Sequence, residues 1–114
     1  MSPKKNPLNL NTLQLKTLTI LQAVAELPEA AERNEADGSV KITALPHAHG
    51  NHVHVGPYMV SGADATGLQN GGVWAALERK GLVSTDFPNS VTLHKVGVDY
   101  DTGLREAILH EGGH

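Results

Sequence analysis

The chain has 114 residues, a formal net charge of −3, 39% hydrophobic and 4% aromatic residues, and no cysteine. This length suits one domain with a modest core, filled mainly by aliphatic side chains. The absence of cysteine excludes disulfides and thiolate zinc sites and favours a reducing compartment, so we expect a cytoplasmic protein. The negative net charge disfavours a nucleic-acid binder that relies on electrostatics alone.

The N-terminal quarter predicts an arm followed by a helix. Residues 1–9 contain two prolines and no hydrophobic periodicity, so we expect a flexible arm ahead of one domain over residues 10–114. A helix over residues 12–27 is predicted by apolar positions at helical spacing, namely Leu13, Thr17, Ile20, Val24 and Leu27. Polar residues interrupt this stretch, so we expect neither a signal peptide nor a membrane span, and no membrane partner.

Capping residues mark the limits of this helix. Asn9 or Asn11 can serve as its N-cap, and Pro28 marks its end. Proline at a first helical position predicts one more short helix over residues 28–33. The acidic run over residues 26–37 is interpreted as a solvated face.

From Val40 onward the hydrophobic period changes from 3.6 to 2, which predicts strands and a hairpin. Gly50 and Asn51 tolerate positive φ and suit a two-residue turn. That turn would place four imidazoles on one face, as two facing pairs: His47 with His54, and His49 with His52. The opposite face would collect the apolar residues Val40, Ile42, Ala44, Ala48, Val53, Val55 and Met59. A wider loop over residues 46–51 is the competing geometry, since Pro46 would weaken the ladder.

The histidine face suggests metal chemistry. Imidazole is the commonest protein metal ligand, so a divalent metal such as zinc, nickel or iron is one expectation for His47, His49, His52 and His54. A pH-sensitive face and a plain solvent-exposed strand face are the alternatives. Residues 110–114 match the His-Glu-x-x-His pattern of zinc proteases, but two central glycines oppose the required helix. No nucleophile–base pair is visible elsewhere, so we do not expect an enzyme.

The second half predicts two helices and a strand pair. Residues 63–68 form a short, weakly specified helix, and a second helix starts near residues 70–72 and ends at Gly81, a suitable C-cap glycine. A strand follows from Leu82. Residues 86–89 form a turn, and residues 90–93 return as the partner strand.

The run from Val73 to Val83, with Glu78-Arg-Lys-Gly81-Leu-Val, resembles the recognition helix and following strand of winged-helix regulators of the MarR and PadR kind. Residues 93–97 resemble the step that follows the wing in those families. The resemblance implies an α+β, winged-helix-like domain: an N-terminal helix, a strand, a helix–turn–helix, a two-stranded wing and a short C-terminal segment. The histidine-rich hairpin is an addition that simple members lack.

The resemblance also implies a transcriptional regulator that binds duplex DNA as a homodimer. The DNA-contact candidates are the amide and basic side chains on or near the second helix and wing: Gln69, Asn70, Arg79, Lys80 and Lys95. Base contacts usually come from the N-terminal half of a recognition helix. Since Arg79 and Lys80 lie at its far end, the alternative is a metal-binding or protein-interaction module that uses the histidine hairpin without catalysis.

Overall fold

The computed structural model describes residues 6–111, which form four α-helices, short 3₁₀ segments and two small antiparallel sheets. The expected α+β class is confirmed at this level. The first helix, α1 (Thr12–Val24), begins with a capping box, because Asn11 and Gln14 exchange side chain to backbone hydrogen bonds of 2.8 and 3.0 Å. Asn11 is therefore the N-cap. The helix ends at Val24 rather than Leu27, since the amides of Glu26 and Leu27 bond three residues back as the chain turns towards Pro28.

The predicted short helix over residues 28–33 is wrong. Residues 28–30 form a turn, and Ala31–Arg33 form strand β1, which pairs antiparallel with β2 (Val40–Ile42). The pairing runs from Ala31 with Ile42 to Arg33 with Val40. Backbone bonds to a neighbouring strand thus override the local helical preference of the sequence.

Sheet A has the strand order β1-β2-β7-β6. Strands β6 (Val83–Asp86) and β7 (Ser90–Leu93) form the expected pair around the turn at residues 87–89, and β7 also pairs with β2. Val40 and Ile42 were expected on the apolar face of the histidine hairpin. Both are buried, but in sheet A, because residues 43–47 carry the chain away before the hairpin starts.

Sheet B has the order β3-β4-β5-β8 and contains the histidine hairpin. Its strands are β3 (Ala48–His49), β4 (His52–Val55), β5 (Tyr58–Ser61) and β8 (His110–Glu111). The turn at Gly50 and Asn51 is confirmed, with a positive φ of 66° at Gly50.

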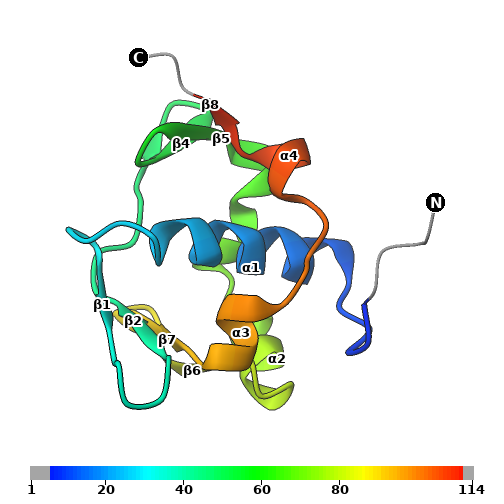
Figure 1. Cartoon of the computed structure of the whole chain (residues 1–114). Coiled ribbons are helices and arrows are strands. Elements are labelled where there is room, and N and C mark those ends of the chain that lie inside the picture. The colour runs from blue at the N-terminus through cyan, green and yellow to red at the C-terminus, as the bar shows by residue number, and fades with distance from the viewer. Residues whose placement is uncertain (1–5, 112–114) are drawn as a thin grey trace.

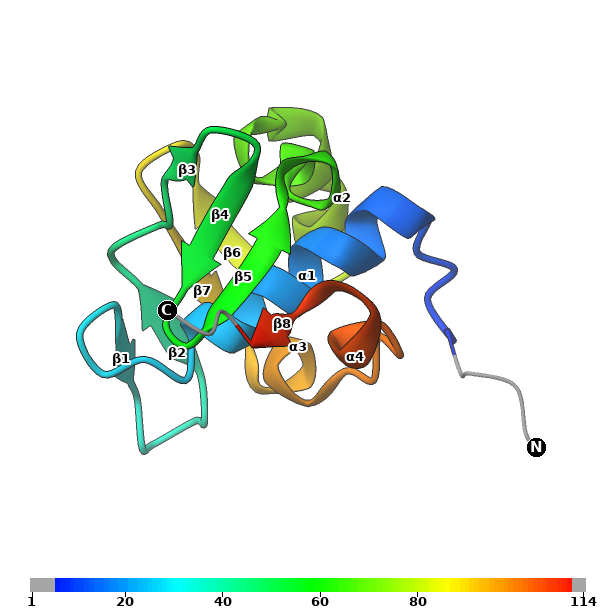
Figure 2. The ribbon, with the colours of Figure 1, turned by 90° about the horizontal axis from the view of Figure 1, so that it is seen from above.

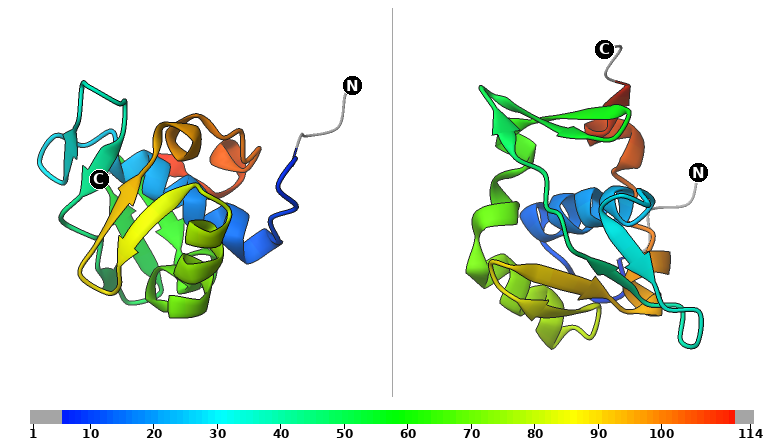
Figure 3. Two further views of the ribbon diagram at one scale, coloured as in Figure 1. Left: turned by 90° about the horizontal axis from the view of Figure 1, so that it is seen from below. Right: turned by 90° about the vertical axis from the view of Figure 1, so that its left-hand side faces the viewer.

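Helix α1 lies between the two sheets. Figure 1 shows sheet B above it and sheet A below it, and the side view in Figure 3 agrees. Seen from above in Figure 2, the strands of sheet B lie over α1. Five consecutive α1 residues, 17–21, are almost fully buried. Burial all around a helix indicates that it is covered on several sides, so α1 is the centre of the core.

The remaining helices complete the layers around α1. Two 3₁₀ segments, η1 (Gly62–Asp64) and η2 (Thr66–Gln69), lead into α2 (Gly71–Arg79), and short helices α3 (Lys95–Asp99) and α4 (Arg105–Ile108) follow β6 and β7. Gln22 ties α1 to the end of α3 through 2.8 Å hydrogen bonds to the carbonyls of Gly97 and Tyr100. No helix among residues 6–111 has the length and apolar character needed to cross a membrane.

Candidate functional site

Helix α2 carries two of the DNA-contact candidates at its start. Asn70 is its N-cap, and its Oδ1 accepts from the amides of Gly72 at 2.9 Å and Val73 at 3.3 Å. Gln69 is exposed immediately before it. Since the Asn70 side-chain oxygen already holds the helix end, only its amide group is left to meet a ligand.

The basic DNA-contact candidates lie elsewhere in the layer of the fold that contains α2. Arg79 and Lys80 are exposed at the C-terminal end of α2, where Lys80 Nζ donates to the carbonyl of Leu8 at 2.7 Å. Lys95, on α3, forms a 2.7 Å ion pair with Asp99. The exposed side of α2 carries Gly72, Ala75 and Glu78 beside Arg79. The structure therefore does not gather the five candidates into one basic patch.

The turn of the β6–β7 pair is attached to α2 by an aromatic contact that the sequence analysis missed. The rings of Phe87 and Trp74 meet edge-on, with centroids 4.7 Å apart. Trp74 is 1% exposed, whereas Phe87 is 39% exposed. A partly exposed aromatic ring on a buried tryptophan connects the turn surface to the core of α2.

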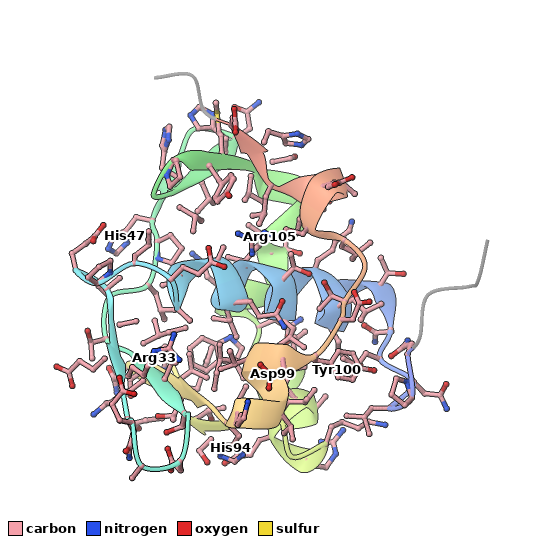
Figure 4. All side chains as sticks on the ribbon, in the orientation of Figure 1. Arg33, His47, His94, Asp99, Tyr100 and Arg105 are labelled. Carbon is pink, nitrogen blue, oxygen red and sulfur yellow. The ribbon has the colours of Figure 1, made fainter. Side chains whose placement is uncertain are left out.

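His94 fastens the other end of the β6–β7 pair. Its imidazole contacts Ser84 Oγ at 2.7 Å and the carbonyl of Gly81 at 3.1 Å. Figure 4 shows His94 and Asp99 in the lower layer, away from the segment that carries His47. These contacts give His94 a structural role at the end of the β6–β7 pair.

The histidine hairpin is formed only in part as predicted. His49 and His52 are register partners, and the imidazoles of His52 and His54 lie 4.9 Å apart in an edge-to-face arrangement. His47 precedes β3, so the expected pairing of His47 with His54 is wrong. Its place is the segment between the two sheets, at the left of Figure 4.

Met59 lies on the histidine side of sheet B, not on the apolar side assigned to it. The register pairs His54 with Met59 and Met59 with His110, so the three share one face. The reason is the two-residue turn at Gly56 and Pro57. It pairs even-numbered residues of β4 with odd-numbered residues of β5, so Met59 lies on the same face as His54.

Metal-ligand geometry is not assembled in the part of the chain that the structure describes. No group of three or more histidine, aspartate or glutamate side chains there is close enough to hold an ion. His110 and Glu111 form a strand rather than a helix, while the remaining residues of the His-Glu-x-x-His pattern lie outside the described range. The helical geometry of a zinc protease is therefore absent at His110 and Glu111.

A groove of about 530 Å³ brings together two residues that the sequence analysis assigned to different sites, His47 and Gln69. Its walls come from residues 45–47, β4, the η1–η2 segment, and the β6–β7 turn. Most of the lining is apolar. The groove depends on segments distant in the sequence, so no local pattern could have predicted it.

An ionic and aromatic cluster joins the turn after α1, strand β5 and helix α4. Arg105 forms a 2.8 Å ion pair with Glu26, and its guanidinium lies 5.5 Å from the ring centroid of Tyr58. Hydrogen bonds to Glu26 and Tyr58 raise the pKa of Arg105, so this side chain stays charged. The contact with Tyr58 fixes α4 against sheet B, and the ion pair with Glu26 fixes it to the turn after α1, so Arg105 (labelled in Figure 4) has a structural role.

Comparison of the chain with protein-family models, with curated proteins and with solved structures finds no match.

Proposed function

We propose that this chain is a winged-helix-type regulator that binds duplex DNA through α2 and the β6–β7 wing, as a homodimer. The observation that carries the proposal is the order of elements around α1. A helix, strand β2, the short η2, helix α2 and the strand pair β6–β7 follow one another as the resemblance to MarR- and PadR-like regulators implies. The pairing of β2 with β7 supports it, because it attaches the proposed wing to a strand from the part of the chain between α1 and the histidine hairpin.

The charges on this surface set the strength of binding that we expect. Arg79 and Lys80 offer about two phosphate contacts per chain, since Lys95 is paired with Asp99. Glu78 lies on the exposed side of α2 and opposes phosphate. Binding by one chain is therefore weak, and a homodimer, which doubles the contacts, is the form expected to bind measurably.

Fluorescence anisotropy of a labelled random duplex, measured over a series of salt concentrations, tests the proposal. The logarithm of affinity falls by about 0.9 per phosphate contact for each tenfold rise in salt, so a slope near −2 indicates one chain and a slope near −4 indicates a homodimer. Sedimentation equilibrium of the free protein gives the oligomeric state independently. Absence of salt-dependent binding at low salt removes the proposal.

A second candidate function is metal binding on the histidine hairpin, favoured by the 4.9 Å contact between the imidazoles of His52 and His54. The backbone register places His49 opposite His52. Zinc, nickel or iron would suit such a set. His47 has no part in it, because it lines the groove instead.

Elemental analysis of purified protein and thermal shifts with zinc, nickel and iron salts test this candidate. We expect one metal ion per chain and a rise in melting temperature that is lost in His52→Ala. His94→Ala is the control histidine variant, because His94 lies in the other layer. Failure of all three metals to bind or stabilise the protein sinks the idea.

A further inference from the structure

The groove lined by residues 45–47 and the β6–β7 turn has the size of a small-molecule site. Its volume is about 530 Å³, within the range of roughly 300–1,000 Å³ that is common for ligand pockets. It is built from four segments: residues 45–47, β4, residues 62–69, and the β6–β7 turn. Residues 45–47 link β2 of sheet A to β3 of sheet B (Figure 3), so one wall of the groove comes from the connection between the two sheets.

The walls of the groove are apolar and contain several rings. The main apolar contributors are Leu45, Pro46, Val53, Leu68, Phe87 and Pro88. None of the residues that line the groove is an aspartate, glutamate, lysine or arginine. A ligand that carried a full charge would lose hydration here without gaining a counter-charge from lysine, arginine or a carboxylate.

Three polar side chains also border the groove, those of His47, Thr66 and Gln69. All three residues are exposed, and their side chains form no hydrogen bond with any of the residues described. Together they offer an imidazole, a hydroxyl and an amide, which can both donate and accept. Their donors and acceptors are therefore available to one polar edge of a ligand that is otherwise apolar.

We propose that this groove binds an uncharged, mainly apolar ring compound with one hydrogen-bonding group, such as a hydroxyl, carbonyl or amine. Flat ring surfaces pack against Pro46, Phe87 and Pro88, and the polar group bonds to His47, Thr66 or Gln69. This binding does not involve the DNA-contact residues Arg79 and Lys80. Gln69 and the β6–β7 turn belong to both proposed surfaces, so the groove is tested with probes in the absence of DNA.

The chain contains a built-in reporter of the groove. Trp74 is the only tryptophan, and its indole meets the ring of Phe87, which forms part of the groove wall. A bound chromophore close to Phe87 therefore quenches or shifts the emission of a single, identified fluorophore.

Two related probes test the proposal. N-phenyl-1-naphthylamine is uncharged and has one N–H group, whereas 1-anilinonaphthalene-8-sulfonate adds an anionic sulfonate to the same rings. We expect saturable quenching of Trp74 by the uncharged probe with one site per chain, and binding of the sulfonate at least about tenfold weaker. Equal or tighter binding of the sulfonate, or no saturable binding of the uncharged probe, overturns the proposal.

A pair of matched variants places the binding site. Thr66→Phe fills the groove from an exposed position, and Ala63→Phe adds the same bulk at an exposed position that does not line it. We expect the first to weaken binding of N-phenyl-1-naphthylamine at least about tenfold and the second to leave it unchanged. Chemical-shift mapping on the unmodified chain should give the largest changes at Val53, Leu68 and Phe87. Equal affinities of the two variants when both are folded, or shift changes centred elsewhere, contradict the assignment.

Discussion

The ring of Phe87 meets the indole of Trp74 at an interplanar angle of 80°, and this contact joins the turn between β6 and β7 to the buried side of α2. Phe87→Ala removes it. We expect a loss of about 1–2 kcal/mol in the free energy of unfolding and a red shift of Trp74 emission, because water then reaches the indole. Urea unfolding followed by tryptophan fluorescence measures both. Val96→Ala, at a position that is 60% exposed, should change neither, and an unshifted spectrum in Phe87→Ala contradicts the contact.

Gly67 allows η2 to pack directly on α1. A Cβ atom at position 67 would overlap Oγ1 of Thr17, so we expect Gly67→Ala to lower the free energy of unfolding by about 2–3 kcal/mol or more. Adding Thr17→Ala removes the overlapping hydroxyl. The double variant should therefore be less destabilised than the sum of the two single variants, by a coupling energy of about 1 kcal/mol or more. Strict additivity in denaturant unfolding contradicts direct contact between these positions.

Two substitutions of Asn70 distinguish its helix-capping role from its proposed contact with DNA. Asn70→Ala removes the acceptor for the amides of Gly72 and Val73 and should cost about 1 kcal/mol of stability. Asn70→Asp keeps an equally good capping oxygen but places a negative charge at the proposed DNA surface. We expect Asn70→Asp to unfold at nearly the same denaturant concentration as the natural chain and to bind duplex more weakly. Unchanged anisotropy titrations for Asn70→Asp place the DNA, if bound, elsewhere.

Arg79 and Arg33 are both exposed arginines but lie on different elements, so Arg33 serves as the control position for Arg79. If α2 contacts phosphate, Arg79→Ala reduces the magnitude of the salt slope by about one for each chain that binds. Arg33→Ala, on β1, should leave the slope unchanged. Equal effects of the two substitutions would indicate binding that depends only on net charge.

Asp37 lies in the turn between β1 and β2 and makes a pH-dependent contribution to the free energy of unfolding. Its carboxylate accepts hydrogen bonds from Ser39 Oγ at 2.7 Å and from the Ser39 amide at 2.9 Å, and these bonds lower the pKa of Asp37. Because the folded pKa is below the unfolded one, this stabilisation is complete above the ordinary carboxyl pKa and is lost as pH falls through the lower folded value. In an NMR titration, Ser39→Ala should raise the pKa of Asp37. A pKa that does not rise in this variant disproves the role of Ser39.

Features encoded within a few neighbouring residues could be predicted from the sequence. The capping residue Asn11, the turn glycine Gly50 and the helix start near residue 70 depend on backbone groups within about three residues. Caps and tight turns depend on side-chain chemistry and allowed φ values at single positions, so they need no information about distant segments. The register of His49 with His52 followed from Gly50 for the same reason.

Partnerships between distant segments were decided only by the tertiary structure. Residues 31–33 became a strand because β2 offered a backbone partner, and β2 joined β7 instead of the histidine hairpin. Met59 changed face because one turn altered the alternation between two strands. The groove and the contact of Phe87 with Trp74 need segments that meet only after folding. Several pairings satisfy the same hydrogen-bonding needs of a short strand, and the choice among them depends on how the whole core packs around α1.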